Sequence, residues 1–167
     1  MKNWKKELEE GKILNGLNGF NDKFSFLSNF YSHKNINIKL PYNTQNGKFY
    51  SSNNVETLFQ AAKCLKINDI EKILKAATPG QAKRLGKKIE LRPDWEIIKT
   101  KVMKELIENK FKLNPVLKKQ LINIPNNKYI VEMNVWNDKE WGVCYKTLVG
   151  NNKLGKILME VKAELEK

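Results

Sequence analysis

Residues 52–64 read Ser52-Asn53-Asn54-Val55-Glu56-Thr57-Leu58-Phe59-Gln60-Ala61-Ala62-Lys63-Cys64 and predict a helix of about three turns. Asn53 is the candidate N-cap, because asparagine is a preferred residue at that position. One face of the helix is apolar, with Val55, Leu58, Phe59, Ala62 and Leu65. A second face carries a carboxylate, an amide and an amine in one row, from Glu56, Gln60 and Lys63.

Glu56 has two interpretations at this point. Asn53-x-x-Glu56 fits a capping box, in which the glutamate side chain bonds back to the first turn. The alternative is a catalytic carboxylate that the helix presents beside Gln60 and Lys63. Spacing alone favours the cap, since capping boxes are common helix starts.

Length and composition indicate one globular domain. The chain has 167 residues, 41% of them hydrophobic, which suits a single domain with a buried core. No apolar run reaches the length of a membrane span, and the first residues lack the apolar segment of a signal peptide. We therefore expect a cytoplasmic protein with no membrane partner. The sequence contains no internal repeat and no glycine-rich loop of the P-loop or dinucleotide type.

The cysteine and histidine residues do not indicate a metal site, a disulfide framework or a nucleophilic relay with several candidates. Cys64 and Cys144 lack the spacing of a metal site or a disulfide framework, so both are expected to be buried thiols. His33 is the only histidine, which leaves one candidate for a Ser-His or Cys-His relay and argues against a histidine metal site. We expect neither a metal nor a cofactor.

The formal net charge is +13, which favours polyanionic partners such as nucleic acid, nucleotides and phosphorylated metabolites. Of the 31 basic residues only Arg84 and Arg92 are arginines, so 31 − 2 leaves 29 lysines, and these are scattered through every segment. A dedicated nucleic-acid groove more often clusters arginine with aromatic residues. The charge is therefore compatible with nucleic-acid contact without establishing it.

Hydrophobic periodicity predicts a helix-rich α+β single domain over residues 1–167, with a few short antiparallel strands rather than a βαβ series. Besides the helix at 52–64, helices are expected at 4–10, 68–77, 78–89, 91–111, 114–121 and from 154 to the C-terminus. Strands are expected at 36–40 and 48–51, forming a hairpin, and at 129–136 with a return strand at 141–145.

Without a metal or several histidines, the simplest catalytic group that the sequence offers is a pair of carboxylates. Glu56 and Asp138 are the best placed, since each stands among aromatic or amide side chains. One carboxylate can stabilise an oxocarbenium-like centre or activate water, while the other helps the leaving nitrogen to accept a proton. Phe30 and Trp136 could hold a base or another flat ring.

Further blocks follow in a specific order between about residues 18 and 165. They are Phe26-Leu27-Ser28-Asn29-Phe30-Tyr31, Tyr50-Ser51-Ser52-Asn53-Asn54-Val55-Glu56-x-x-x-Gln60-Ala61-x-Lys63, Arg84-Leu85-Gly86, Arg92-x-Asp94-Trp95, Met103, Lys110-Phe111-x-x-Asn114-Pro115-x-Leu117, Glu132-x-Asn134, Asp138-x-x-Trp141-Gly142 and Gly150-x-Asn152-x-Leu154-Gly155-x-x-Leu158-Met159. This ordered set resembles the NADAR domain family of YbiA-like proteins.

The resemblance implies an N-glycosidase of nucleotide-like substrates, which breaks a C1′–N bond to an exocyclic amine. The leading expectation is removal of ADP-ribose from guanine bases of nucleic acid. The second is cleavage of ribosylamino-pyrimidine phosphates of the riboflavin pathway to ribose 5-phosphate and the amino-pyrimidine. Both substrates offer phosphates to a basic pocket and a flat ring to aromatic side chains.

Matched residue by residue, the resemblance implies that Glu56 is the catalytic glutamate and that Asp138 is the aspartate before Trp141-Gly142. Lys63, on the same helix face, either forms a Schiff base with an opened glycosylamine or holds charge. The substrate-binding residues expected are Asn29, Phe30, Gln60, Arg84, Trp95, Asn134, Trp136 and Trp141. These matches favour a catalytic role for Glu56 over a role as a helix cap.

Two readings of another class stay open. One is a non-catalytic module that binds ADP-ribose or NAD, although such a module would not need both Glu56 and Asp138. The other is a basic nucleic-acid-binding domain, which would show steep salt dependence without turnover.

Overall fold

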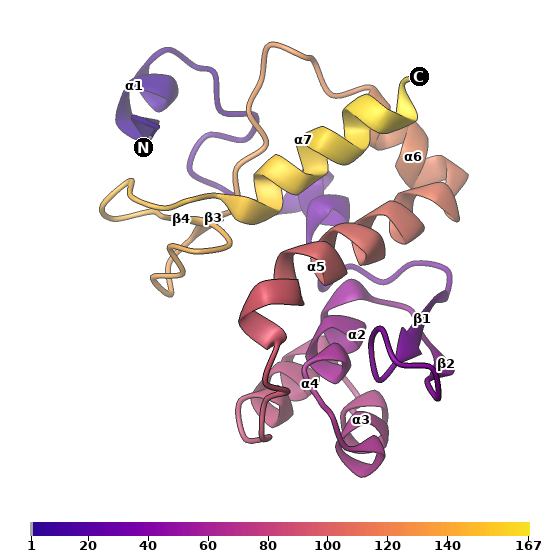
Figure 1. The fold of residues 1–167 in the computed structure, drawn as a ribbon. Coiled ribbons are helices and arrows are strands. Elements are labelled where there is room, and N and C mark those ends of the chain that lie inside the picture. The colour runs from indigo at the N-terminus through magenta and orange to yellow at the C-terminus, as the bar shows by residue number, and fades with distance from the viewer. Residues whose placement is uncertain (1) are drawn as a thin grey trace. The chain divides into compact units, whose positions relative to one another are not determined.

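The computed structural model describes residues 2–167 and is a helix-rich α+β fold with a few short strands, as the sequence predicts (Figure 1). The helices are α1 (Trp4–Glu9), the 3₁₀ helix η1 (Asp22–Leu27), α2 (Val55–Ala62), α3 (Ile67–Leu74), α4 (Pro79–Gly86), α5 (Trp95–Lys112), α6 (Pro115–Ile122) and α7 (Lys153–Leu165). The strands are β1 (Ile36–Leu40), β2 (Lys48–Ser52), β3 (Met133–Asn134) and β4 (Val143–Cys144).

Contacts divide the chain into two compact units. The central unit is Asn29–Asn114, and the terminal unit combines the N-terminal residues through Ser28 with Pro115–Lys167. The expectation that residues 1–167 form a single domain stays a prediction.

In the central unit, β1 and β2 form the antiparallel hairpin that the sequence predicts, with Ile36 opposite Ser52 and Leu40 opposite Lys48. Residues of β1 alternate between buried and exposed, so one face of the hairpin joins the core. Helix α2 contacts both strands and also α3, α4 and α5. This position makes α2 the centre of the unit.

Every residue of α2 is buried, including those of the polar row. The helix is also shorter than predicted, because its backbone leaves the helical path after Lys63. The carbonyl of Lys63 accepts a hydrogen bond from the Arg92 N–H, and Cys64 forms a bridge with Leu91. Leu65, expected on the apolar face, is consequently 53% exposed.

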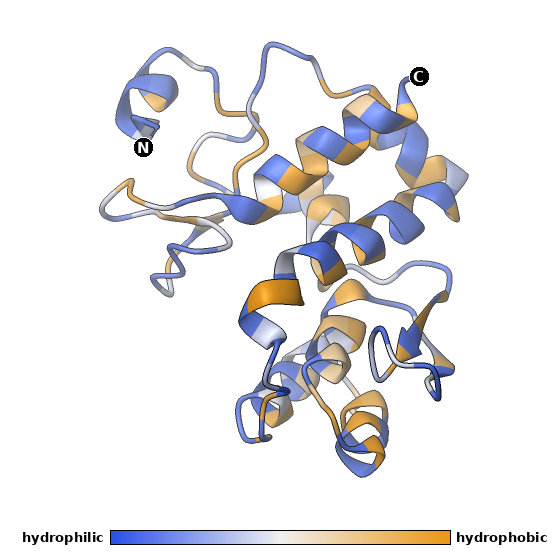
Figure 2. Ribbon diagram, in the orientation of Figure 1, coloured by the Kyte–Doolittle hydropathy of each residue, from blue (hydrophilic) through white to orange (hydrophobic). Residues whose placement is uncertain are grey.

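Helix α4 begins as predicted. Thr78 caps it by accepting a hydrogen bond from the Gln81 N–H at 3.1 Å, and the Gln81 side chain accepts one from the Ala77 N–H at 2.8 Å. Proline at the first helical position completes this start. Helix α5 begins at Trp95 rather than at residue 91, because Arg92 pairs with Asp94 in the connecting segment. Figure 2 shows hydrophobic and hydrophilic residues alternating along α5 and α7, as expected of helices with one buried face.

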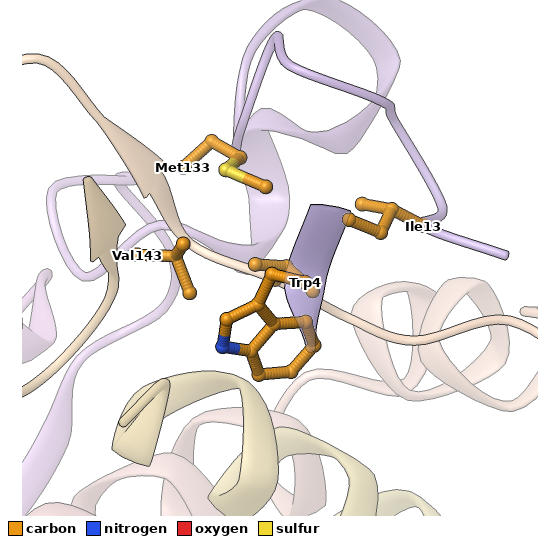
Figure 3. Packing of buried hydrophobic residues seen from close by; sticks show 5 residues of the cluster. Trp4, Ile13, Met133 and Val143 are labelled. Atoms are coloured by element: carbon orange, nitrogen blue, oxygen red, sulfur yellow. The ribbon is translucent and has the colours of Figure 1, made fainter. Parts of the chain in front are cut away.

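The terminal unit has a core around Trp4, which packs with Ile13, Val131, Met133 and Val143 (Figure 3). The Trp4 indole N–H donates a hydrogen bond to the carbonyl of Gly150 at 2.9 Å. Residues far apart in the sequence are thereby joined through one side chain, and α6 contacts α7 elsewhere in the same unit.

The strand predicted at 129–136 is wrong in length, and its expected antiparallel return is wrong in direction. Only Met133–Asn134 is extended with a partner, and it pairs in parallel with Val143–Cys144. The preceding backbone has other partners: Tyr129 bonds to the 12–14 segment, while Ile130 and Glu132 bond to the side chain of Asn152. The alternation of apolar residues therefore reflects burial and not a continuous ladder.

Candidate active site

Helix α2 starts one residue later than the sequence predicts. Its N-cap is Asn54, whose side-chain oxygen accepts a hydrogen bond from the Thr57 N–H at 2.8 Å. Asn53 is used differently: its carbonyl accepts from the His33 N–H, and its amide donates to the Ser32 hydroxyl. Glu56 is thus the second residue of the helix, so the predicted capping box from Asn53 to Glu56 is wrong.

The carboxylate of Glu56 is held inside the central unit. The residue is 6% exposed, and its Oε1 accepts a hydrogen bond of 2.7 Å from Nε2 of Gln60, one turn along the helix. Its own N–H donates to the carbonyl of Asn29 at 3.0 Å. A buried carboxylate is costly unless it is hydrogen-bonded, so its retention here is typical of a functional group.

Gln60 is fixed by close packing against α4. It is 4% exposed, and a Cβ atom on Gly86 would lie 2.0 Å from its Oε1. Because Gly86 has no side chain, α4 can pack closely against α2 at Gln60, whose amide bonds to Glu56. Within the described residues, the Gln60 Oε1 has no hydrogen-bond partner and faces Gly86 at the contact of α2 with α4.

Lys63 follows α2 on the same side as Glu56 and Gln60. Burial lowers the pKa of its ammonium below the usual range; the Glu56 charge acts against this shift, and the positive charges of Lys83 and Lys87 add to it. The Glu56 carboxylate and the Lys63 amine are therefore electrostatically coupled. Sequence reasoning did not place Lys83 and Lys87 beside Lys63, because the approach of α4 to α2 is a tertiary contact.

Asn29 and Phe30 enter the same region from the loop before β1. Asn29 is 8% exposed and donates to the sulfur of Met103 at 3.4 Å, while its Oδ1 has no hydrogen-bond partner among residues 2–167. Phe30 is 44% exposed, and the Lys83 ammonium lies 5.8 Å from its ring centroid. An exposed ring beside a cation suits a ligand that carries both a flat ring and negative charge.

Arg84 and Trp95 have different environments. Arg84 is exposed on α4, and both its Nη1 and the Phe30 ring edge lie within 4 Å of the position of a Cβ on Gly80. Both groups therefore lie near the start of α4, and a phosphate-binding role for Arg84 stays a prediction. Trp95 is 4% exposed, and its ring centroid lies 5.0 Å from that of Phe59, so it packs in the core beside α2.

The remaining predicted residues belong to the terminal unit. Asn134 is 2% exposed, and its side chain bonds to the N–H and carbonyl of Asp138 and to the carbonyl of Val143. Asp138 accepts hydrogen bonds at Oδ1 from the N–H groups of Glu140 and Trp141, at 3.0 and 2.9 Å. Both side chains therefore shape the loop between β3 and β4. Trp141 is half-buried.

Trp136 stands out among the tryptophans because it is 61% exposed. Trp4 and Trp95 are only 2% and 4% exposed. The loop after β3 therefore presents one large aromatic surface to its surroundings.

In the part of the chain that the structure describes, acidic, cysteine and histidine side chains form no group that could hold a metal ion. Both cysteines are free and buried, and burial raises the pKa of the Cys64 thiol to about 12, which makes it a poor nucleophile. Burial also lowers the pKa of His33.

None of the helices described within residues 2–167 is long and apolar enough to cross a membrane.

Similar proteins cover both units. An N-glycosidase of Nostoc punctiforme is 36% identical over 116 residues, which are 66% of this chain and 72% of that protein. The N-glycosidase YbiA of Escherichia coli is 32% identical over 112 residues, which are 66% of this chain and 68% of that protein. A riboflavin biosynthesis protein of Vibrio vulnificus is 31% identical over 147 residues, which are 87% of this chain but only 36% of that longer protein.

The fold has a solved counterpart. The NMR structure of Escherichia coli YbiA superposes with a TM-score of 0.69 at 31% sequence identity, covering 87% of this chain and 80% of that one. Residues 18–166, which include every site residue named above, match the NADAR domain. The chain belongs to the NADAR domain family.

Proposed function

We propose that this protein is an N-glycosidase that hydrolyses a C1′–N bond to an exocyclic amine, and that its substrate is ADP-ribose attached to guanine in nucleic acid. The observation that carries the proposal is the buried Glu56 carboxylate, oriented by Gln60 and coupled to the Lys63 amine. Relatives named N-glycosidases support the reaction class.

Glu56 acts on the sugar. As the C1′–N bond breaks, positive charge develops at C1′, and a nearby carboxylate stabilises that charge or activates the attacking water. Water supplies the oxygen at C1′ and a proton to the departing amine, either by attacking C1′ directly or by hydrolysing an imine formed at Lys63. The hydrogen bond from Gln60 holds the carboxylate in one orientation, so Glu56 does not have to reorganise during the reaction.

The central unit carries groups that can bind the base ring and the phosphates of the proposed substrate. Phe30 offers an exposed face, while Lys83 and Arg84 place positive charge next to it. The buried acceptor of Asn29 can receive hydrogen bonds from substrate N–H or O–H groups. A nucleotide-like molecule brings all three features together.

A second substrate is favoured by one specific observation, the similarity of 87% of this chain to a riboflavin biosynthesis protein. A ribosylamino-pyrimidine phosphate has the same type of C1′–N bond and carries a phosphate and a flat ring. The net charge of +13 supports the nucleic-acid substrate over this smaller one, because a nucleic-acid strand carries many phosphates.

The Glu56→Gln variant tests the reaction class. The amide is isosteric with the carboxylate but cannot stabilise positive charge, so we expect turnover to fall by about a thousandfold or more with unchanged thermal stability. Asp138→Asn is the companion variant, since asparagine keeps the acceptor for the Glu140 and Trp141 N–H groups and removes only the charge. A wild-type rate for Glu56→Gln would exclude Glu56 from the mechanism; ligand binding without turnover in the wild type would identify a binding module.

A further inference from the structure

The parallel pairing of β3 with β4 brings two loops to one end of the ladder. Parallel strands run in the same direction, so the chain after Asn134 and the chain after Cys144 emerge at the same end. The Tyr145 N–H donates to the Asn134 carbonyl at 2.8 Å, which fixes the start of the second loop beside the end of β3. With strands about 5 Å apart, Val135 and Tyr145 are neighbours. Figure 1 shows both loops extending beyond these strands.

Each loop exposes an aromatic side chain close to the ladder. Trp136 is 61% exposed and Tyr145 is 43% exposed. Exposed aromatic rings with a polar edge are enriched at binding surfaces, where one face is covered and the edge stays hydrated. Two such rings on adjoining loops therefore indicate a surface that binds a partner.

The two loops carry both basic and acidic side chains. Lys139 and Lys146 are exposed on the same two loops. Hydrogen bonds from Thr147 lower the pKa of the Cys144 thiol, and the charge of Lys139 adds to this effect, which places that ammonium near the end of β4. The neighbouring acid Glu140 is already paired with Lys153 at 2.7 Å. Asp138, the other acid of these loops, accepts hydrogen bonds from the Glu140 and Trp141 N–H groups.

We infer that Trp136, Tyr145, Lys139 and Lys146 form a surface, here called the loop-end surface, that binds unpaired nucleotides of the nucleic-acid strand carrying the substrate. The rings stack on bases, which present a flat face whatever the sequence, and the ammonium groups contact the phosphates. The inference rests on the proposed nucleic-acid substrate and adds a contact to the strand itself. A protein partner is disfavoured because interfaces between proteins are depleted in lysine.

Binding of an unmodified oligonucleotide tests this surface without any need for turnover. A labelled twelve-nucleotide single-stranded DNA is titrated with the full-length protein, and its anisotropy gives the Kd. We expect Trp136→Ala to weaken binding by about tenfold and Trp136→Ala with Tyr145→Ala by more, in line with measured base–aromatic stacking. We expect Lys139→Gln with Lys146→Gln to weaken binding for every sequence and to reduce its dependence on salt.

The controls separate this surface from the general positive charge. Lys101→Gln with Lys119→Gln removes two exposed lysines elsewhere and should leave the affinity close to that of the wild type. Tryptophan fluorescence gives a second readout: DNA should quench the wild type and leave Trp136→Phe unquenched. Equal affinity in the aromatic variants, or equal losses in both lysine pairs, would overturn the inference.

A further comparison distinguishes failure of this inference from failure of the proposed function. Tyr145→Ala and the Lys139→Gln with Lys146→Gln variant should keep the wild-type rate on an ADP-ribosylated mononucleotide and lose rate only on an ADP-ribosylated oligonucleotide. A wild type that binds no DNA but cleaves the mononucleotide overturns the loop-end surface and leaves the glycosidase standing. A wild type that binds DNA through these residues but cleaves neither substrate supports the surface and contradicts the enzyme.

Discussion

Lys63 has a different role in each of two mechanisms for cleavage of the C1′–N bond. Its pKa is lowered mainly by burial, so a larger share of the amine is neutral near pH 8 than for an ordinary lysine. A neutral amine can attack the open-chain imine of a glycosylamine, displace the base amine and form its own imine, which water then hydrolyses. A charged amine can only stabilise negative charge.

We predict the imine route at Lys63. Borohydride added during turnover should leave a reduced sugar adduct on Lys63, detected by peptide mass spectrometry. The yield should rise with pH and reach its plateau at a lower pH than for an ordinary lysine, because burial lowers the pKa of Lys63. Lys63→Arg keeps a positive charge but forms no imine, and should lose at least about a hundredfold in rate. No adduct, together with a near wild-type rate for Lys63→Arg, would assign the residue to charge stabilisation.

Lys110 is a second buried amine, and its burial makes the stability of the fold depend on pH. It is 1% exposed, and its ammonium lies 5.7 Å from the Tyr31 ring centroid and 5.3 Å from that of Phe111. Burial lowers its pKa to about 7. In the unfolded chain the pKa returns to about 10.4, so the unfolded state binds more protons between these values. The Lys110 contribution to stability therefore improves as the pH rises from about 7 to about 10.

Lys110→Met tests that pH dependence. Methionine fills a similar volume without charge, so we expect the free energy of unfolding to rise by about 2 kcal/mol at pH 6. This gain should shrink toward pH 10, because the folded-state amine is neutral there and the pH approaches the unfolded-state pKa of about 10.4. Urea unfolding at pH 6, 8 and 10 measures it, with the exposed Lys112→Met as control. A difference that does not change with pH would show that packing, and not protonation, sets the effect.

At the scale of elements, the start of α2 controls where its functional side chains point. Asn53 and Asn54 are equally good caps in the sequence. Tertiary contacts decide between them, because Asn53 bonds to His33 and Ser32, which leaves Asn54 to cap the helix. We expect Asn54→Ala to cost about 1 kcal/mol of stability and Asn53→Ala clearly less, by thermal or urea unfolding. The reverse ranking would restore the capping box of Glu56.

The contact of α2 with α4 gives another matched pair of variants. Gly86→Ala would push its methyl group into the Gln60 amide, so it should cost about 1–3 kcal/mol of stability and about tenfold or more in turnover, as Glu56 loses its hydrogen bond. Gly80→Ala meets nothing closer than 3.8 Å and should be neutral or slightly stabilising, because alanine favours helix. Calorimetric melting and a turnover assay distinguish the two, and equal effects of the two alanines would contradict the packing argument.

The strands show what sequence patterns can and cannot predict. The hairpin of β1 and β2 was predictable, since alternation and a turn-rich loop between neighbouring strands are local signals. The 129–136 strand was not, because Asn152 and the 12–14 segment supply its hydrogen-bond partners from distant parts of the chain. Direction of pairing at β3 and β4 likewise depends on side chains, namely the loop bonds of Asn134 and Asp138.

At the scale of the whole molecule, the fold class and the family followed from ordered motifs spread over most of the chain. The candidate site was only partly predictable. Glu56, Gln60 and Lys63 were found because one helix spaces them along one row. The positions of Gly86, Lys83 and Lys87 beside Gln60 and Lys63 were not predictable, because they depend on the packing of α4 on α2. The charge of +13 leans toward a nucleic-acid substrate, but its scattered lysines mark no binding groove.

One assay tests the central claim most directly. The wild type and Glu56→Gln are incubated separately with an oligonucleotide carrying ADP-ribosyl-guanine and with a ribosylamino-pyrimidine phosphate, and products are identified by mass spectrometry. We predict that the wild type releases ADP-ribose from the oligonucleotide and restores guanine, while Glu56→Gln releases none. Release of ribose 5-phosphate from the pyrimidine substrate alone, or equal release by the wild type and Glu56→Gln, would contradict the account.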